Sequence, residues 1–128
     1  MGKCSQDKKG RPFMPISTKV WEEIMDPYDI VDYKIDLSTL LATGEEIASY
    51  SINIPAESQL YGLTLGTGTR APSLNLMNLT LWLQVDSAFQ SDPKFIKGLT
   101  LPIEVTIVTN STPSRRKQRT VAVKVLQR

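Results

Sequence analysis

Few side chains in this sequence have the chemistry for catalysis. Histidine, the commonest general base and zinc ligand, is absent from all 128 residues, and the only cysteine is Cys4. Cys4 lies in a polar segment and has no second cysteine with which to form an internal disulfide. A zinc site would therefore need carboxylate ligands alone. The composition argues against an enzyme and predicts neither a metal nor another cofactor.

Two motifs resemble catalytic sequences only superficially. Glu22, Glu23, Asp26 and Asp29 form an acidic run, but a paired-carboxylate hydrolase holds its two groups about 5 to 10 Å apart across a cleft. Neighbours in a turn do not supply that spacing, so a solvated face is favoured. The segment 62–68 is rich in glycine but lacks the Lys-Ser/Thr ending of a phosphate loop, and it predicts a β-turn. We predict no catalytic residues.

A basic cluster is the strongest candidate for binding chemistry. Arg115, Arg116, Lys117 and Arg119 fall at the expected tip of a hairpin, where they would contact phosphates or carboxylates. No aromatic residue is interleaved to stack on bases, so an acidic protein surface is favoured over nucleic acid.

Charge is segregated along the chain, although the net charge is only +2. Residues 1–20 have five basic and one acidic side chain, residues 21–110 have four basic and twelve acidic ones, and residues 111–128 have six basic ones. This pattern suits self-assembly, with the basic ends of one subunit meeting the acidic body of a neighbour. The alternative is that solubilising charges simply cluster.

The elements that position these side chains are β-strands. Residues 101–126 predict one long β-hairpin, because apolar residues occupy every second position on both sides of the polar turn 109–118. Further strands are expected at 30–37, 47–54 and 60–65, and two more within 74–85, separated by a break near 77–78. Trp82 should point away from the face of Leu79, Leu81 and Leu83. Residues 87–98 are expected to form a polar loop.

These strands predict an all-β fold, an immunoglobulin-like two-layer β-sandwich of about six or seven strands over residues 25–128. Residues 1–24 are predicted to be an extended N-terminal arm, polar and basic and without a secretory signal. Its end, 18–25, fits either a short helix stopped by Pro27 or an extended lead-in to the sheet. No stretch approaches the roughly 20 apolar residues of a membrane span.

Surfaces rather than clefts are therefore the expected functional sites. In the arm, the candidates for contact with a partner are Lys8, Lys9, Arg11, Phe13, Met14 and Ile16. In the body, Trp21, Tyr61 and Trp82 are candidate anchors, since tryptophan, tyrosine and arginine dominate interface energetics. A place in the core is the competing interpretation for each aromatic residue.

Five segments resemble a family of tailed-bacteriophage virion proteins, described as fibre proteins or fibre–tail adaptor proteins. They are 25–37 (MDPYDIVDYKIDL), 44–49 (GEEIAS), 52–55 (INIP), 103–110 (IEVTIVTN) and 119–125 (RTVAVKV). The chain departs from the family pattern at Met25 and Leu37, where lysine and tryptophan are expected, and at Glu45 and Glu46, in place of Asp-Thr. Its middle, 60–97, is also longer.

The resemblance implies a structural protein of the virion, assembled in the bacterial host cytoplasm. It would be a tail-associated adaptor that bridges the tail or head–tail region to fibres through protein–protein contacts. Its partners would be tail, head–tail connector, fibre or capsid proteins, and several copies would form a symmetric assembly. One alternative is a capsid cement or decoration protein. Another is a receptor- or carbohydrate-binding module of a fibre, using Tyr61 with Asn75 and Asn78.

Overall fold

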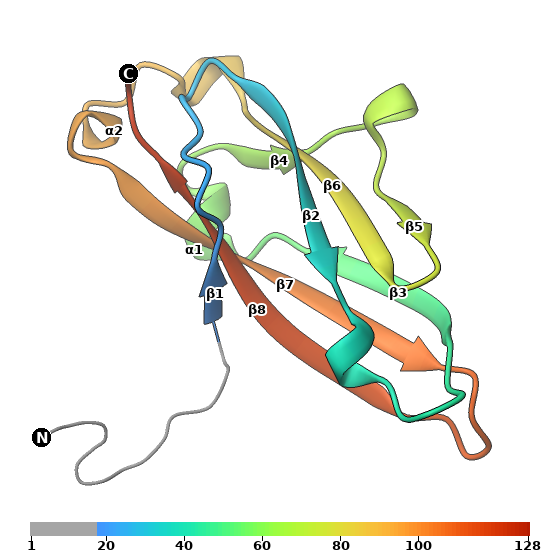
Figure 1. Cartoon of the computed structure of the whole chain (residues 1–128). Helices are drawn as coiled ribbons and strands as arrows, with labels where there is room; N and C mark the ends of the chain where they lie inside the picture. The colour runs from blue at the N-terminus through green and yellow to red at the C-terminus, as the bar shows by residue number, and fades with distance from the viewer. Residues whose placement is uncertain (1–17) are drawn as a thin grey trace, which may run out of the picture.

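The computed structural model describes residues 18–128 and folds them into two β-sheets packed face to face (Figure 1). The first sheet holds, in spatial order, β1 (Thr18–Val20), β8 (Arg116–Val125), β7 (Leu99–Thr109) and β3 (Ile47–Asn53). The second sheet holds β2 (Ile30–Asp36), β6 (Asn78–Val85) and, on the far side of β6, β4 (Leu63–Leu65) and β5 (Ser73–Asn75). Two short helices complete the structure, α1 (Ala56–Gln59) and α2 (Lys94–Lys97). The candidate arm residues Lys8, Lys9, Arg11, Phe13, Met14 and Ile16 lie outside the described residues.

The strand order is that of an immunoglobulin-like sandwich, which confirms the predicted fold class. In the usual lettering, β3, β7 and β8 correspond to strands C, F and G, and β2 and β6 to B and E. Strand D is represented by β4 and β5, which pair with opposite ends of β6. Every pair is antiparallel except β1 with β8, which is parallel.

The core follows from the period-two alternation of apolar residues. Leu79, Leu81, Leu83 and Val85 point inward from β6 and are buried, whereas Trp82 points to the outer face, as predicted. They pack against the odd-numbered residues of β7, from Leu101 to Ile107. Burying one face of each sheet in this way is the main stabilising contribution of such a domain.

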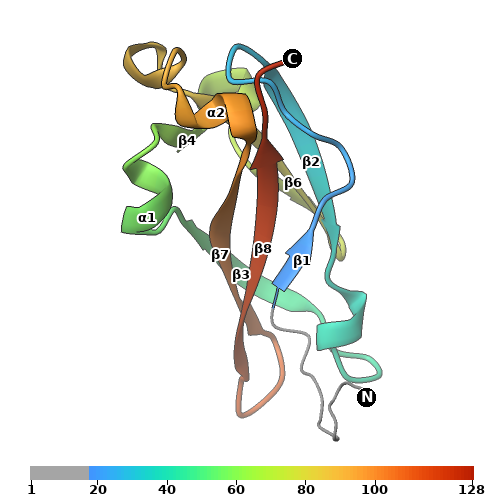
Figure 2. The same cartoon turned by 90° about the vertical axis from the view of Figure 1, so that its left-hand side faces the viewer.

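The predicted hairpin and the break in 74–85 are both confirmed. β7 and β8 pair over ten residue pairs, from Leu99↔Val125 to Val108↔Arg116. The break is a tight turn at Leu76 and Met77, with Leu76 at a φ of 58°. In Figure 2 the β7–β8 hairpin extends beyond the rest of the sheet at the lower end of the molecule.

The helix considered for 18–25 is absent, and the extended alternative is the one observed. β1 lies beside β8, and Trp21 N–H then donates to the Ala122 carbonyl at 3.1 Å. Met25 N–H donates to the Lys124 carbonyl at 2.9 Å, so this segment follows β8 along its edge. The sheet therefore begins at Thr18, within the segment assigned to the arm. Sheet hydrogen bonds outweigh the local helical spacing of Val20 and Ile24.

The expected polar loop 87–98 is more structured than the sequence indicated. It contains α2, whose Phe95 is fully buried in the core, and the Phe95 carbonyl accepts a hydrogen bond from Gln127 N–H at 2.8 Å. The apolar residues of this segment do not alternate regularly, so the burial of Phe95 was not predicted. Among residues 18–128, no helix is long and apolar enough to span a membrane.

The glycine-rich segment 62–68 serves the packing of the sandwich. Gly62 has a φ of +80°, and a Cβ there would lie 2.6 Å from Phe89 Cδ2. A Cβ at Gly66 would lie 2.5 Å from the Arg70 carbonyl oxygen. Glycine is required at both positions because Phe89 and the Arg70 backbone approach too closely to leave room for a side chain.

Candidate protein-interaction surface

Three connections gather at one end of the sandwich, which we call the hairpin end. They are residues 37–46, the turn at Leu76 and Met77, and the turn 110–115 between β7 and β8. Backbone hydrogen bonds tie them together: Leu37 N–H donates to the Met77 carbonyl, and Asn110 N–H to the Glu46 carbonyl, both at 2.9 Å. In return, Glu46 N–H donates to Asn110 Oδ1 at 2.9 Å. The end therefore presents one continuous surface rather than three independent loops.

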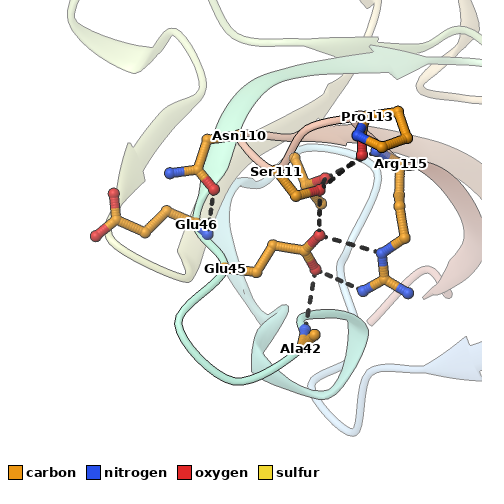
Figure 3. A network of polar contacts seen from close by, with 8 residues as sticks. Ala42, Glu45, Glu46, Asn110, Ser111, Pro113 and Arg115 are labelled. Carbon is orange, nitrogen blue, oxygen red and sulfur yellow. Dashed lines mark hydrogen bonds and ion pairs between the residues drawn. The ribbon is translucent and has the colours of Figure 1, made fainter.

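The Glu45 carboxylate is the centre of this end (Figure 3). Arg115 approaches it with two nitrogens, Nε to Oε2 at 3.1 Å and Nη2 to Oε1 at 2.5 Å. Ser111 Oγ donates to Oε2 at 2.7 Å, and Ala42 N–H donates to Oε1 at 2.9 Å. Only 4% of the Glu45 side chain is exposed, against 43% for Arg115. A paired carboxylate with every partner in place fixes the hairpin turn to the 37–46 connection.

This network lowers the pKa of Glu45 well below its usual value of 4.5, first through Arg115 and then through the Ala42 and Ser111 donors. A depressed carboxylate pKa stabilises the fold above the unfolded value and loses that contribution as the pH falls. We therefore expect the chemical denaturation midpoint to fall between about pH 5 and pH 3. The fall should be smaller in Glu45→Gln, whose amide does not titrate. Equal pH dependence in the two proteins would contradict this role of Glu45.

The predicted basic cluster is divided by the structure. Arg115 lies in the turn and binds Glu45, whereas β8 begins at Arg116, so the following residues are in a strand. Alternation places Arg116 on the exposed outer face, while Lys117 and Arg119 share the inward parity of Val121 and are half-buried. Of the predicted cluster, only Arg115 therefore lies in the hairpin turn, and the other three residues lie along β8. Arg116 is the residue of the cluster that faces solvent freely.

An apolar hollow lies beside this end, and the sequence did not indicate it. Glu45, Glu46, Ile47, Leu74, Leu76 and Met77 line the hollow, which has a volume of about 250 Å³. Leu76 is 79% exposed and Met77 41% exposed, although both are large apolar side chains. Exposed apolar groups around a hollow are a feature of binding surfaces. No local pattern reveals this site, because its residues come from two sheets.

Trp21 has an intramolecular role. Its ring stacks on Tyr33 with centroids 4.6 Å apart, and its Nε1–H donates to the Lys34 carbonyl at 3.0 Å. Burial, with the charges of Glu23 and Asp29, raises the pKa of Tyr33 to about 12. Tyr33 thus stays protonated and donates to the Glu23 carbonyl at 3.2 Å. Trp21 fastens the segment after β1 onto β2.

Tyr61 and Trp82 lie on different parts of the molecule. Tyr61 contacts Phe95 edge to face at 6.3 Å and accepts a hydrogen bond from Lys94 Nζ at 3.2 Å. Trp82 is half-buried on the outer face of the second sheet, with the Arg70 guanidinium 5.8 Å from its ring centroid. The three predicted anchors therefore form no common patch, and each one contacts a neighbour within the chain.

Within residues 18–128, no group of three or more histidine, cysteine or acidic residues is arranged to hold a metal ion. No protein-family model matches the sequence, and a search of curated proteins finds no match either. The class of the protein is therefore defined by its fold: an immunoglobulin-like β-sandwich with an exposed apolar hollow at the hairpin end.

Proposed function

We propose that this chain is a non-enzymatic structural protein of a tailed-phage virion. It acts as a tail-associated adaptor, present in several copies, that joins the tail or head–tail region to fibres. The virion context rests on the five segments that resemble the adaptor family. The mode of action, protein–protein contact, rests on the hairpin end.

The observation that carries the proposal is the exposed apolar hollow next to a rigid loop cluster. Immunoglobulin-like sandwiches commonly place their binding residues on the loops at one end, positioned by the sheets below. Here the Glu45 network holds these loops together, so little conformational entropy is lost when a partner binds. Leu76 and Met77 supply the apolar contact, and Arg116 supplies positive charge.

The carbohydrate-binding alternative receives no support from the positions of its residues. Asn75 and Asn78 pair at the start of β6, whereas Tyr61 precedes β4, which pairs with the other end of β6. The eight residues of β6 separate them by about 23 Å, too far for a shared sugar site. The cement-protein alternative uses the same surfaces and differs in the number of copies.

Copy number tests the proposal directly. We expect quantitative mass spectrometry of purified particles, with the portal protein as the internal standard, to find this chain in the small multiples typical of a symmetric tail assembly. Hundreds of copies would make it a capsid cement protein, and its absence from particles would refute a virion role.

A further inference from the structure

The outer edge of β3 is open to a further strand. Within residues 18–128, β3 pairs with β7 on one side and with no strand on the other. Its seven residues, Ile47–Asn53, include no charged residue and no proline. Natural proteins usually protect exposed edges with charged residues or proline, because an open edge recruits another strand. The small outer-face residues Ser49 and Ser51 leave room for a neighbour.

Acidic residues lie near both ends of β3. Glu46 precedes β3 and is exposed, and Glu57 follows it and is exposed. Glu104 lies across from Asn53 and accepts a hydrogen bond from its Nδ2 at 2.8 Å. Pairing of β3 with β3 of a second copy would bring these acidic ends together. The edge therefore favours a basic strand.

Residues 1–17 of this chain have that composition. Four basic side chains, at Lys3, Lys8, Lys9 and Arg11, stand against Asp7 alone, and the apolar group Phe13, Met14 and Ile16 follows. The hollow at the start of β3, between Ile47 and Leu74, is apolar with Glu45 and Glu46 on its rim. A strand antiparallel to β3 would place Met14 and Ile16 at the hollow and Lys8 to Arg11 near Glu57, at the other end of β3.

We propose that residues 8–16 of one copy add an antiparallel strand to the open edge of β3 in a second copy, with Met14 and Ile16, which share one face of that strand, in the hollow. β-Strand addition of this kind draws affinity from main-chain hydrogen bonds and specificity from side-chain pockets. Pro15 is compatible, since an outermost strand tolerates a missing N–H on its solvent side. The proposal deepens the proposed function by naming the contact between copies, and takes from it only the presence of several copies.

In this register, residues 8–16 cannot pair with β3 of their own molecule. Thr18 is level with Thr120, Glu104 and Asn53 across the first sheet. Crossing four strand spacings, from β1 to a strand outside β3, and moving from the level of Asn53 to that of Ile47 amounts to about 28 Å. The chain from Ile16 to Thr18 spans at most about 7 Å. The strand must therefore come from another molecule.

Cross-linking between two full-length variants tests the proposal. In a Cys4→Ser background, Met14→Cys is mixed with Leu76→Cys and treated with a short bismaleimide. We expect a covalent heterodimer that does not form when Leu76→Cys is replaced by Ile96→Cys, since Ile96 is 63% exposed but lies on α2, away from β3. Equal yields from both mixtures, or no heterodimer at all, would overturn the proposal.

A charge reversal provides a second, independent measurement. Glu57→Lys should weaken self-association in sedimentation by on the order of tenfold, whereas Glu22→Lys, an exposed acidic residue remote from β3, should leave it unchanged. Equal effects of the two changes would count against the docking register. Both measurements use purified protein, so the absence of this chain from virions would refute the proposed function and leave this contact standing.

Discussion

Removal of residues 1–16 is expected to abolish incorporation of the chain into particles while the sandwich still folds. The described sheet begins at Thr18, and the buried core residues that the structure describes lie at or beyond Met25, so the truncation leaves this core intact. It does remove the basic and apolar residues proposed to bind a neighbour. In the proposed assembly every copy attaches through that contact, so the loss should be nearly complete.

Particles assembled with the truncated chain provide the measurement, by quantitative mass spectrometry, alongside thermal unfolding of the purified protein. A shorter deletion of residues 1–6 is the matched control, because it leaves Lys8 to Ile16 intact and should incorporate normally. Normal incorporation of the longer truncation would show that the arm does not attach the protein.

Phe95→Ala is expected to cause the largest loss of stability among single substitutions at the α2 end of the molecule. Phe95 is fully buried, contacts Tyr61, and lies in a helix that is held to the C-terminal segment through Gln127. Truncating a buried phenylalanine removes its transfer free energy and leaves a cavity, so we expect a loss of about 3 to 5 kcal/mol in the free energy of unfolding.

Denaturant titration of both proteins measures this difference. The adjacent residue supplies the control: Ile96 belongs to the same helix but is exposed, so Ile96→Ala should change the free energy of unfolding by no more than about 0.5 kcal/mol. Similar small effects at both positions would mean that α2 does not close the core.

The position of Phe95 also illustrates a limit of sequence patterns. Strands with one buried face repeat apolar residues at every second position, which is why β2, β3, β6 and the long hairpin were predicted close to their observed bounds. Phe95 is one of two apolar residues in a four-residue helix, and its neighbour Ile96 is exposed. Nothing local marks it as buried, since its environment is built by Tyr61 and the C-terminal segment.

The candidate surface shows the same limit. The five-residue run Arg115–Arg119 looks like one basic patch in sequence, but the start of β8 divides it between two faces and the turn. Glu45 and Arg115 are 70 residues apart, so their pairing has no sequence signal. The apolar hollow likewise joins residues of 45–47 to residues of 74–77.

Alternation of apolar residues alone therefore determined the all-β class, the closing hairpin and the inward face of each strand. This pattern is local and follows from the pleat of a strand, which sends successive side chains to opposite faces. Only the tertiary structure decided that residues 18–25 extend the sheet and that Glu45 joins two loops. It also decided that β3 is an outermost strand, with an open edge and acidic residues near both of its ends. These features arise from contacts between segments distant in sequence, where hydrogen bonds and burial outweigh local preference.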